Sequence, residues 1–292
     1  MMKRFFLLSI ALVLLCFALS GCSKKLYTEE ERNKIHDIIG YVEHEQMVYQ
    51  RVVEKSLPGY LGPLMAYDKD FRYYISTRNY DPSRPAMALS FDDGPRNVST
   101  NTILDTLEKY GVHATFFMVG ENIGEGTQET IDRIRSLGCE IGNHTYDHSY
   151  LTSLTEEQIK YEIEHNNELI KQYAGVDCEL FRPPGGLVND TIREIADMPL
   201  IYWTIDTRDW ESRDAASILS NVRAYKSDGS IVLMHDLYDS TAEAVQTIIP
   251  ELLDEGYQLM SVSELAYVKG IELEKKSDYY EIAAAEEEAV SE

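Results

Sequence analysis

The run Ala86-Met-Ala-Leu-Ser-Phe91 leads directly into Asp92-Asp93-Gly94-Pro95. An apolar stretch of this length predicts a buried strand, and the Gly-Pro pair after it predicts a turn. The two carboxylates are therefore expected at the tip of a strand. Taken alone, Asp-Asp-Gly is common in turns, because Asp hydrogen-bonds its own backbone and Gly supplies positive φ, so the assignment needs support from other parts of the chain.

A second polar cluster, His144-Thr-Tyr-Asp-His148, follows the strand-like run Cys139-Glu-Ile-Gly-Asn143. A single local turn can aim both imidazoles at a common point. One Asp with two neutral His would supply three protein ligands and leave open positions on a divalent metal, which is the arrangement of catalytic rather than structural zinc. The other Asp of the strand tip would then be free to act as a base.

Three more polar clusters end apolar runs along the chain. They are Arg182-Pro-Pro-Gly-Gly186, Asp206-Thr-Arg-Asp209-Trp210 and Leu233-Met-His235-Asp236. Each has an ordinary structural explanation by itself, such as a rigid turn, a core aromatic residue or a hydrogen-bonded core histidine. Five such clusters at five strand ends indicate instead one shared site.

Apolar runs alternate with helical stretches from residue 86 onward, which predicts an α/β fold with a parallel sheet and right-handed crossovers. The candidate strands are 86–91, 114–119, 139–143, 179–182, 200–205, 230–235 and 257–262. Together they predict an incomplete barrel of the (β/α)7 type. Every polar cluster falls at the C-terminal end of a strand, where such barrels build their active sites.

The N-terminal segment predicts export. Lys3 and Arg4 precede an apolar run over residues 5–19 that is short for a transmembrane helix and closes in small residues. The sequence Leu19-Ser20-Gly21-Cys22 resembles the lipobox of bacterial lipoproteins. This resemblance implies that residues 1–21 are a cleaved signal peptide, that Cys22 carries lipid, and that the protein is anchored at the extracytoplasmic face of a bacterial membrane. An ordinary signal peptide and an uncleaved anchor are the alternatives.

The regions around the barrel have their own patterns. Residues 22–81 open with a capping box at Thr28-Glu-Glu-Glu31 and an apolar stripe at helical spacing, which predicts a helical extension and a linker. We expect that helix to pack on the catalytic domain rather than to form a stalk. Residues 269–292 are expected to form an acidic, solvated tail that is disordered at its end.

Composition sets limits on both partners and compartment. The formal net charge of −23 and the pI near 4.6 argue against a nucleic-acid partner, because such binding needs clustered Lys and Arg. A chain of 292 residues with 44% hydrophobic content can bury a core without disulfides. Cys139 and Cys178 are therefore expected to be inert buried thiols, and a disulfide between them is the alternative for an exported protein.

The five polar clusters, in this order and spacing, resemble the polysaccharide deacetylase family, carbohydrate esterase family four with its NodB-like homology domain, over about residues 82–268. The resemblance implies a distorted (β/α)-barrel and metal-dependent removal of acetyl groups from sugars. It implies that Asp93, His144 and His148 hold one divalent metal, expected to be Zn²⁺. By the same resemblance Asp92 is the general base.

The remaining clusters receive roles in the same way. The resemblance implies that His235 is the general acid, that Arg182 orients Asp92 and that Asp209 orients His235. Trp210 and Leu233 would line the pocket for the acetyl methyl group.

The position of Gly185 departs from the family pattern. The resemblance assigns its backbone N–H to the oxyanion, and that group is retained. The family commonly carries an aromatic residue at this position, so a platform for stacking a sugar is expected to be missing here.

Physical chemistry supports the same division of labour. An amide carbonyl is a poor electrophile, and a divalent ion can both polarise it and lower the pKa of water. The leaving amine needs a proton, which a His⁺ stabilised by a neighbouring carboxylate can deliver near neutral pH.

We therefore expect a deacetylase that hydrolyses N-acetyl groups of amino sugars in a cell-envelope polysaccharide. Peptidoglycan N-acetylglucosamine is the favoured substrate, because a membrane tether places the enzyme beneath the wall. One alternative keeps the chemistry: an O-acetyl esterase, or a deacetylase of another glycan such as chitooligosaccharide, xylan or a surface polysaccharide. The other is a catalytically silent glycan-binding lipoprotein, which has no use for Asp92, Asp209 and His235.

Overall fold

A computed structural model describes residues 80, 81 and 83–283 of the chain. The sequence-based predictions for the signal peptide, for lipid on Cys22 and for the helical extension lie outside these residues. The end of the predicted acidic tail, residues 284–292, lies outside them as well.

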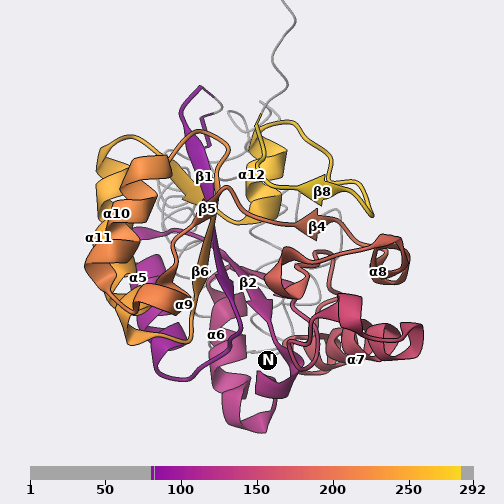
Figure 1. Cartoon of the computed structure of the whole chain (residues 1–292). Helices are drawn as coiled ribbons and strands as arrows, with labels where there is room; N and C mark the ends of the chain where they lie inside the picture. Colours follow the sequence, from indigo (N-terminus) through magenta and orange to yellow (C-terminus); the bar gives the residue numbers. More distant parts are fainter. Residues whose placement is uncertain (1–79, 82, 284–292) are drawn as a thin grey trace, which may run out of the picture. The chain divides into compact units, whose positions relative to one another are not determined.

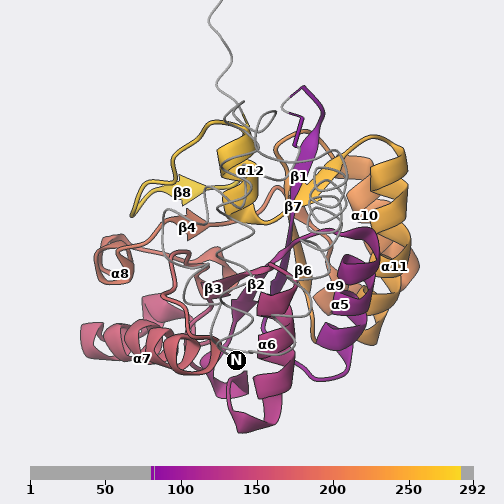
Figure 2. The ribbon, with the colours of Figure 1, turned by 180° about the vertical axis from the view of Figure 1, so that it is seen from behind.

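A parallel sheet forms the centre of the fold (Figures 1 and 2). Its neighbouring strands follow the order β3, β2, β1, β6, β5, and β7 pairs with the start of β1. A smaller parallel pair joins β4 and β8. The strands are β1 Ala86–Asp92, β2 Thr115–Met118, β3 Glu140–Asn143, β4 Leu200–Ile201, β5 Ile205–Asp206, β6 Ile231–His235, β7 Gln258–Met260 and β8 Asp278–Tyr279.

Helices cover the outside of the sheet. Figure 1 shows α5, α10 and α11 together on one side of it and α7 and α8 on the other, and α12 lies beside the start of β1. The helices are α5 Ser99–Tyr110, α6 Gln128–Ser136, α7 Glu156–Ala174, α8 Asp190–Ala196, α9 Asp209–Ser212, α10 Ala215–Tyr225, α11 Asp239–Asp254 and α12 Val262–Val268. Short 3₁₀ turns are Gly120–Asn122, Glu125–Thr127, Leu151–Ser153 and Pro184–Gly186.

The alternation of side chains along β1 decides which residues reach the site. All seven residues of this strand are buried. Met87, Leu89 and Phe91 belong to the hydrophobic core shared with the outer helices. Because successive side chains of a strand point to opposite faces, Ser90 and Asp92 lie on the inner face.

The fold confirms the expected α/β class and the distorted barrel, but two predicted strands differ in detail. The run 179–182 contributes only isolated bridges from Phe181 to Asn143 and to Leu200, which connect β3 to β4. Pro183 and Pro184 follow and lack the N–H needed to continue a ladder. The run 200–205 divides into β4 and β5, and between them the Tyr202 carbonyl accepts a hydrogen bond from the Arg182 side chain instead of a strand partner.

The segment after α12 is packed on the barrel, and the expectation of a solvated tail from residue 269 is wrong for its described part. Tyr279 pairs in register with Ile201. Ile282 is completely buried among the residues at the base of the barrel. The packing of this segment could not be predicted from its acidic composition, because only a few of its apolar residues reach the core.

Two further observations on the described residues concern cysteine and membrane helices. Cys139 and Cys178 are present as thiols rather than as a disulfide. Burial raises the pKa of the Cys178 thiol to about 12, so it is unreactive near neutral pH. Among the helices formed by the described residues, none is long and apolar enough to cross a membrane.

Ile282→Ala should lower the free energy of unfolding by about 2–5 kcal/mol, the usual cost of deleting a buried aliphatic side chain. The exposed neighbour Glu281 is the matched control, and Glu281→Ala should change stability little. Urea unfolding of both variants measures the difference. Equal stability of the two would show that the segment after α12 adds nothing to the core.

Candidate active site

The two aspartates at the end of β1 face different surroundings. Asp92 is the last strand residue and is 3% exposed. Asp93 has φ 73, a left-handed conformation that Asp tolerates better than most residues. The chain therefore turns between them, and although both carboxylates approach His144, Asp92 pairs with Arg182 and Asp93 approaches His148.

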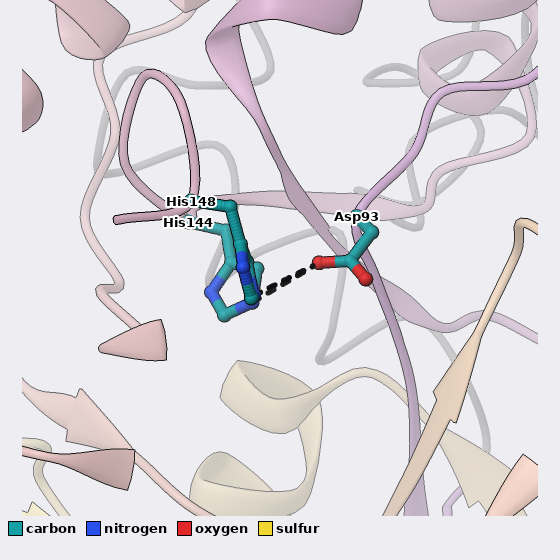
Figure 3. Close-up of side chains that lie close together, drawn as sticks. All are labelled: Asp93, His144 and His148. Carbon is teal, nitrogen blue, oxygen red and sulfur yellow. Dashed lines mark ion pairs between the residues drawn. The ribbon is translucent and has the colours of Figure 1, made fainter. Parts of the chain in front are cut away.

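Asp93 meets His144 and His148 at a common point (Figure 3). Its Oδ1 lies 3.4 Å from Nε2 of His144 and 3.3 Å from Nε2 of His148. These three atoms all lie within 4.8 Å of one another. The same Oδ1 is buried and accepts a hydrogen bond from no described residue.

This cluster fits a small divalent metal. Bonds of about 2.1 Å at tetrahedral angles place ligand atoms roughly 3.4 Å apart, close to the separations from Asp93 Oδ1 to the two imidazole nitrogens. A buried oxygen without a donor is costly unless a cation or another polar group faces it. The three residues are therefore suited to hold Zn²⁺ or a similar ion.

The two imidazoles are held in place from behind. Nδ1 of His144 lies 2.6 Å from the carbonyl oxygen of Arg182, so a proton on Nδ1 leaves Nε2 directed at Asp93. Metal-binding histidines are commonly fixed through their second nitrogen in this way. Thr145 and His148 both have positive φ, and the His148 N–H donates to Thr145 Oγ1 at 3.1 Å. This tight turn brings both rings to one side.

The side chains of α7 that support this turn were not found from the sequence. Glu162 Oε2 accepts from the N–H groups of Tyr146 and Asp147, each at 2.9 Å. Asn166 donates to Oδ1 of Asn143 and to the Met118 carbonyl. Both residues are buried on the apolar stripe of α7, and polar residues at such positions were an available signal.

The protonation of the cluster follows from its charges. Burial by itself would raise the pKa of Asp93, but His144 and His148 outweigh it and lower that pKa to about 2. Burial and the nearby His144 lower the pKa of His148. For His144 burial acts downward, yet Asp92 and Asp93 outweigh it and raise its pKa. Protons and a divalent cation therefore compete for His144, while Asp93 and His148 already have the forms that bind metal.

Arg182 holds Asp92. Its Nη1 donates to Asp92 Oδ1 at 2.6 Å and to Ser90 Oγ at 2.9 Å. The guanidinium is fully buried, its Nε and Nη2 donate to the carbonyls of Ile201 and Tyr202, and it lies 4.1 Å from the ring centre of Phe117. The other oxygen of Asp92, Oδ2, lies 3.5 Å from His144 Nε2. Asp92 therefore stands beside the histidine cluster with one oxygen fixed.

Asp209 holds His235 in place. Its Oδ1 lies 2.7 Å from His235 Nδ1, and its Oδ2 accepts from the His235 N–H and from Thr241 Oγ1, both at 2.7 Å. Burial would lower the pKa of His235, but Asp209, followed by Asp92 and Asp93, raises it to about 9. In register, His235 stands next to Asp92. Asp209 was expected from the sequence, and Thr241 was not.

The other expected residues lie at the same edge. Gly185 has φ 63 in the loop after Arg182. Leu233 is 4% exposed and shares the inner face of β6 with His235, whereas Trp210 is 46% exposed and donates its backbone N–H to Asp209 Oδ1. Their assigned contacts with an acetyl group stay predictions.

Asp236 is a buried carboxyl whose place the sequence did not explain. A Cβ on Gly94 would lie 2.1 Å from Asp236 Oδ2, so only glycine fits between this carboxyl and the turn after β1. Oδ2 also accepts from Thr100 Oγ1 at 2.5 Å. Burial, together with the charges of Asp93 and Asp92, raises the pKa of Asp236 to about 7. Asp236 therefore ties the loop after β6 to the turn that carries Asp93.

Known proteins are similar to this chain in sequence and in fold. The family model described as polysaccharide deacetylase matches residues 79–199. The peptidoglycan-N-acetylglucosamine deacetylase of Bacillus cereus is 35% identical over 191 residues, which cover 63% of this chain and 89% of that protein. The solved family 4 acetyl xylan esterase of Clostridium thermocellum, in complex with a cobalt ion, has a TM-score of 0.65 and 35% identity, covering 68% of this chain and 98% of that one.

The chain belongs to the polysaccharide deacetylase family, as its five polar clusters predicted. It is also 40% identical over 189 residues to the peptidoglycan-N-acetylmuramic acid deacetylase PdaC of Bacillus subtilis. That match covers 65% of this chain and only 40% of PdaC, so the chain spans less than half of the longer relative.

Proposed function

We propose that this protein is a metal-dependent deacetylase that hydrolyses N-acetyl groups of amino sugars in a cell-envelope polysaccharide. The observation that carries the proposal is the convergence of one three-residue cluster and two side-chain pairs at one edge of the barrel. A possible metal site of Asp93, His144 and His148 lies beside an Asp92 fixed by Arg182 and a His235 fixed by Asp209. The relatives from Bacillus cereus and Bacillus subtilis are named as deacetylases of peptidoglycan sugars, which supports the substrate class.

Asp93, His144 and His148 would hold the metal, which we propose is Zn²⁺. Bound there, the ion would polarise the acetyl carbonyl and lower the pKa of a nearby water molecule. The ionised Asp93 and the two imidazole nitrogens match the ligand preferences of zinc.

Asp92 would accept the proton of the attacking water. Its Oδ1 is held by Arg182, and this leaves Oδ2, on the side of His144, for the proton. A general base acts well only when its geometry is fixed, which the buried guanidinium provides.

His235 would protonate the leaving amine. Asp209 occupies Nδ1 and leaves Nε2 for the substrate, and its carboxylate raises the pKa of His235, which favours the charged imidazole. We assign an oxyanion contact to the Gly185 N–H, a type of interaction typically worth about 3 kcal/mol. Trp210 and Leu233 would surround the acetyl methyl group.

Peptidoglycan N-acetylglucosamine remains the favoured substrate within this proposal. N-acetylmuramic acid is the second candidate, since PdaC is named for that sugar. Removal of O-acetyl groups is the third, because an acetyl xylan esterase shares the fold. Mass spectrometry of muropeptides, chitooligosaccharides and acetylated xylan, each incubated with zinc-loaded protein, distinguishes them. A protein that releases acetate from none of these would support the silent glycan-binding alternative.

The two aspartates should separate in a metal assay. His148→Ala removes a proposed ligand and should lower zinc content and acetate release together. Asp92→Asn should keep near-stoichiometric zinc yet lose about 10²–10⁴-fold in kcat, because the proton acceptor is gone. Elemental analysis and acetate release measure both. Loss of zinc in Asp92→Asn but not in Asp93→Asn would mean that the two roles are reversed.

The alkaline limb of the pH profile should report His235. An acid works only while protonated, so activity falls as pH rises through its pKa. Asp209→Asn removes the carboxylate that raises this pKa and should move the limb of kcat/KM roughly 1–2 pH units lower. The difference between variants is the readout, since a bound cation lowers the pKa in both. Asp206→Asn, in the same cluster, is the control, and an unmoved limb in Asp209→Asn would point to another acid.

We also propose that Cys22 is lipidated after removal of residues 1–21 and that the protein is anchored at the outer face of a bacterial membrane. The lipobox-like sequence supports this. Anchoring would place the barrel next to the wall without contributing to its chemistry.

Cys22→Ala should move the protein from the membrane fraction to a soluble pool or block its processing, because the acyl chains supply the membrane affinity. Fractionation and mass spectrometry of the mature N-terminus test this. Unchanged membrane association together with normal processing would contradict lipidation. Cys16→Ala, within the segment expected to be removed, is the matched control.

A further inference from the structure

The ring of Tyr150 lies directly on Gly185. A Cβ on this glycine would be 3.4 Å from Tyr150 Cδ1 and only 2.7 Å from Cε1, and the second distance is closer than real Cβ atoms approach. The φ of 63 disfavours any side chain there as well. The tyrosine thus occupies the space that a residue larger than glycine would need.

Both residues of this contact are neighbours of site residues in the chain. Tyr150 follows His148 by two residues, and Gly185 follows Arg182, whose carbonyl holds His144, by three. On the neighbouring residue Gly186, a Cβ would be 3.4 Å from the ring of Trp203. An aromatic ring therefore lies close to each of the two glycines. Of these rings, that of Tyr150 is exposed at the surface.

The backbone of Tyr150 is fixed while its side chain is presented to solvent. The residue is 56% exposed, although the next residue, Leu151, is fully buried. The Tyr150 carbonyl accepts from the N–H of Ser153 at 3.0 Å and from its Oγ at 2.8 Å. The exposed ring thus pays little conformational entropy when a ligand covers it, because it has few rotatable bonds and a fixed base.

We infer that Tyr150 is a substrate-contacting residue whose ring stacks against a pyranose of the glycan chain. The inference rests on the proposed function. The C–H face of a pyranose is flat and apolar, and the face of an aromatic ring attracts such hydrogens. The hydroxyl group of the tyrosine can stay in water while its ring is covered. The glycine at position 185 predicted that a stacking platform is missing. Tyr150, which follows the turn of His144 and His148, lies over that glycine instead.

Binding of chitotetraose tests this without turnover. In the zinc-loaded Asp92→Asn protein, Tyr150→Ala should weaken binding about 10-fold, as the loss of one aromatic contact does. Tyr150→Phe should stay within about 2-fold, since the ring face remains. Tyr150→Leu keeps apolar bulk without a ring and should resemble Tyr150→Ala. Tyr225→Ala removes an exposed tyrosine of α10 and should bind like the parent.

The kinetic readout separates stacking from catalysis. In the active enzyme, Tyr150→Ala should raise KM for chitotetraose more than it lowers kcat. Gly185→Ala, whose Cβ would push the ring aside, should weaken chitotetraose binding, and its effect should not add to that of Tyr150→Ala.

Two results would overturn the inference: unchanged binding in Tyr150→Ala, or equal binding by the Leu and Phe variants, which would indicate loop packing. Acetate release by the parent is scored separately. A protein that binds chitotetraose through Tyr150 but deacetylates no glycan would retain the inference and lose the proposed function. Normal acetate release with binding indifferent to Tyr150 would do the reverse.

Discussion

The site depends on the buried ion pair between the Arg182 guanidinium and Asp92. The guanidinium carries a full charge with no exposed surface, and burial of an unpaired charge would be costly. The cost is offset because its donors reach Asp92, Ser90 and two backbone carbonyls. Its own carbonyl meets His144, so one residue sets the position of the proposed base and of one proposed ligand. The acceptors of this side chain include Ser90 and Asp92 on the inner face of β1 and the Tyr202 carbonyl between β4 and β5.

Much of this arrangement could be predicted from sequence, because parallel strands bring their carboxyl ends to the same edge. The aspartate pair lies far from His144 and His148 in the chain, but both segments follow predicted strands, so their convergence required only the correct fold class. The choice of Asp93 over Asp92 as the ligand came from the family resemblance. The pairings of Asp92 with Arg182 and of His235 with Asp209 came from the family resemblance. Strand periodicity gives no information about hydrogen bonds between side chains.

What could not be predicted depends on tertiary contacts that leave weak local signals. Glu162 and Asn166 interrupt the apolar stripe of α7, which marks them as unusual, but the backbone groups that they bind are known only from the folded structure. The position of Tyr150 over Gly185 depends on two loops that meet only in the folded barrel. β8 is two residues long and sits in an acidic segment, so its hydrophobic pattern is too short to detect.

The pairing of β8 with β4 also affects the order in which the barrel can be completed. A ribosome makes β4 well before residues 278–282, and domains tend to fold as their chain emerges. Until those later residues arrive, Leu200 and Ile201 lack a partner on one side and the base of the barrel lacks Ile282. The base of the barrel is therefore complete only after residues 278–282 have been made, and until then the edge of β4 is open to pairing with another chain.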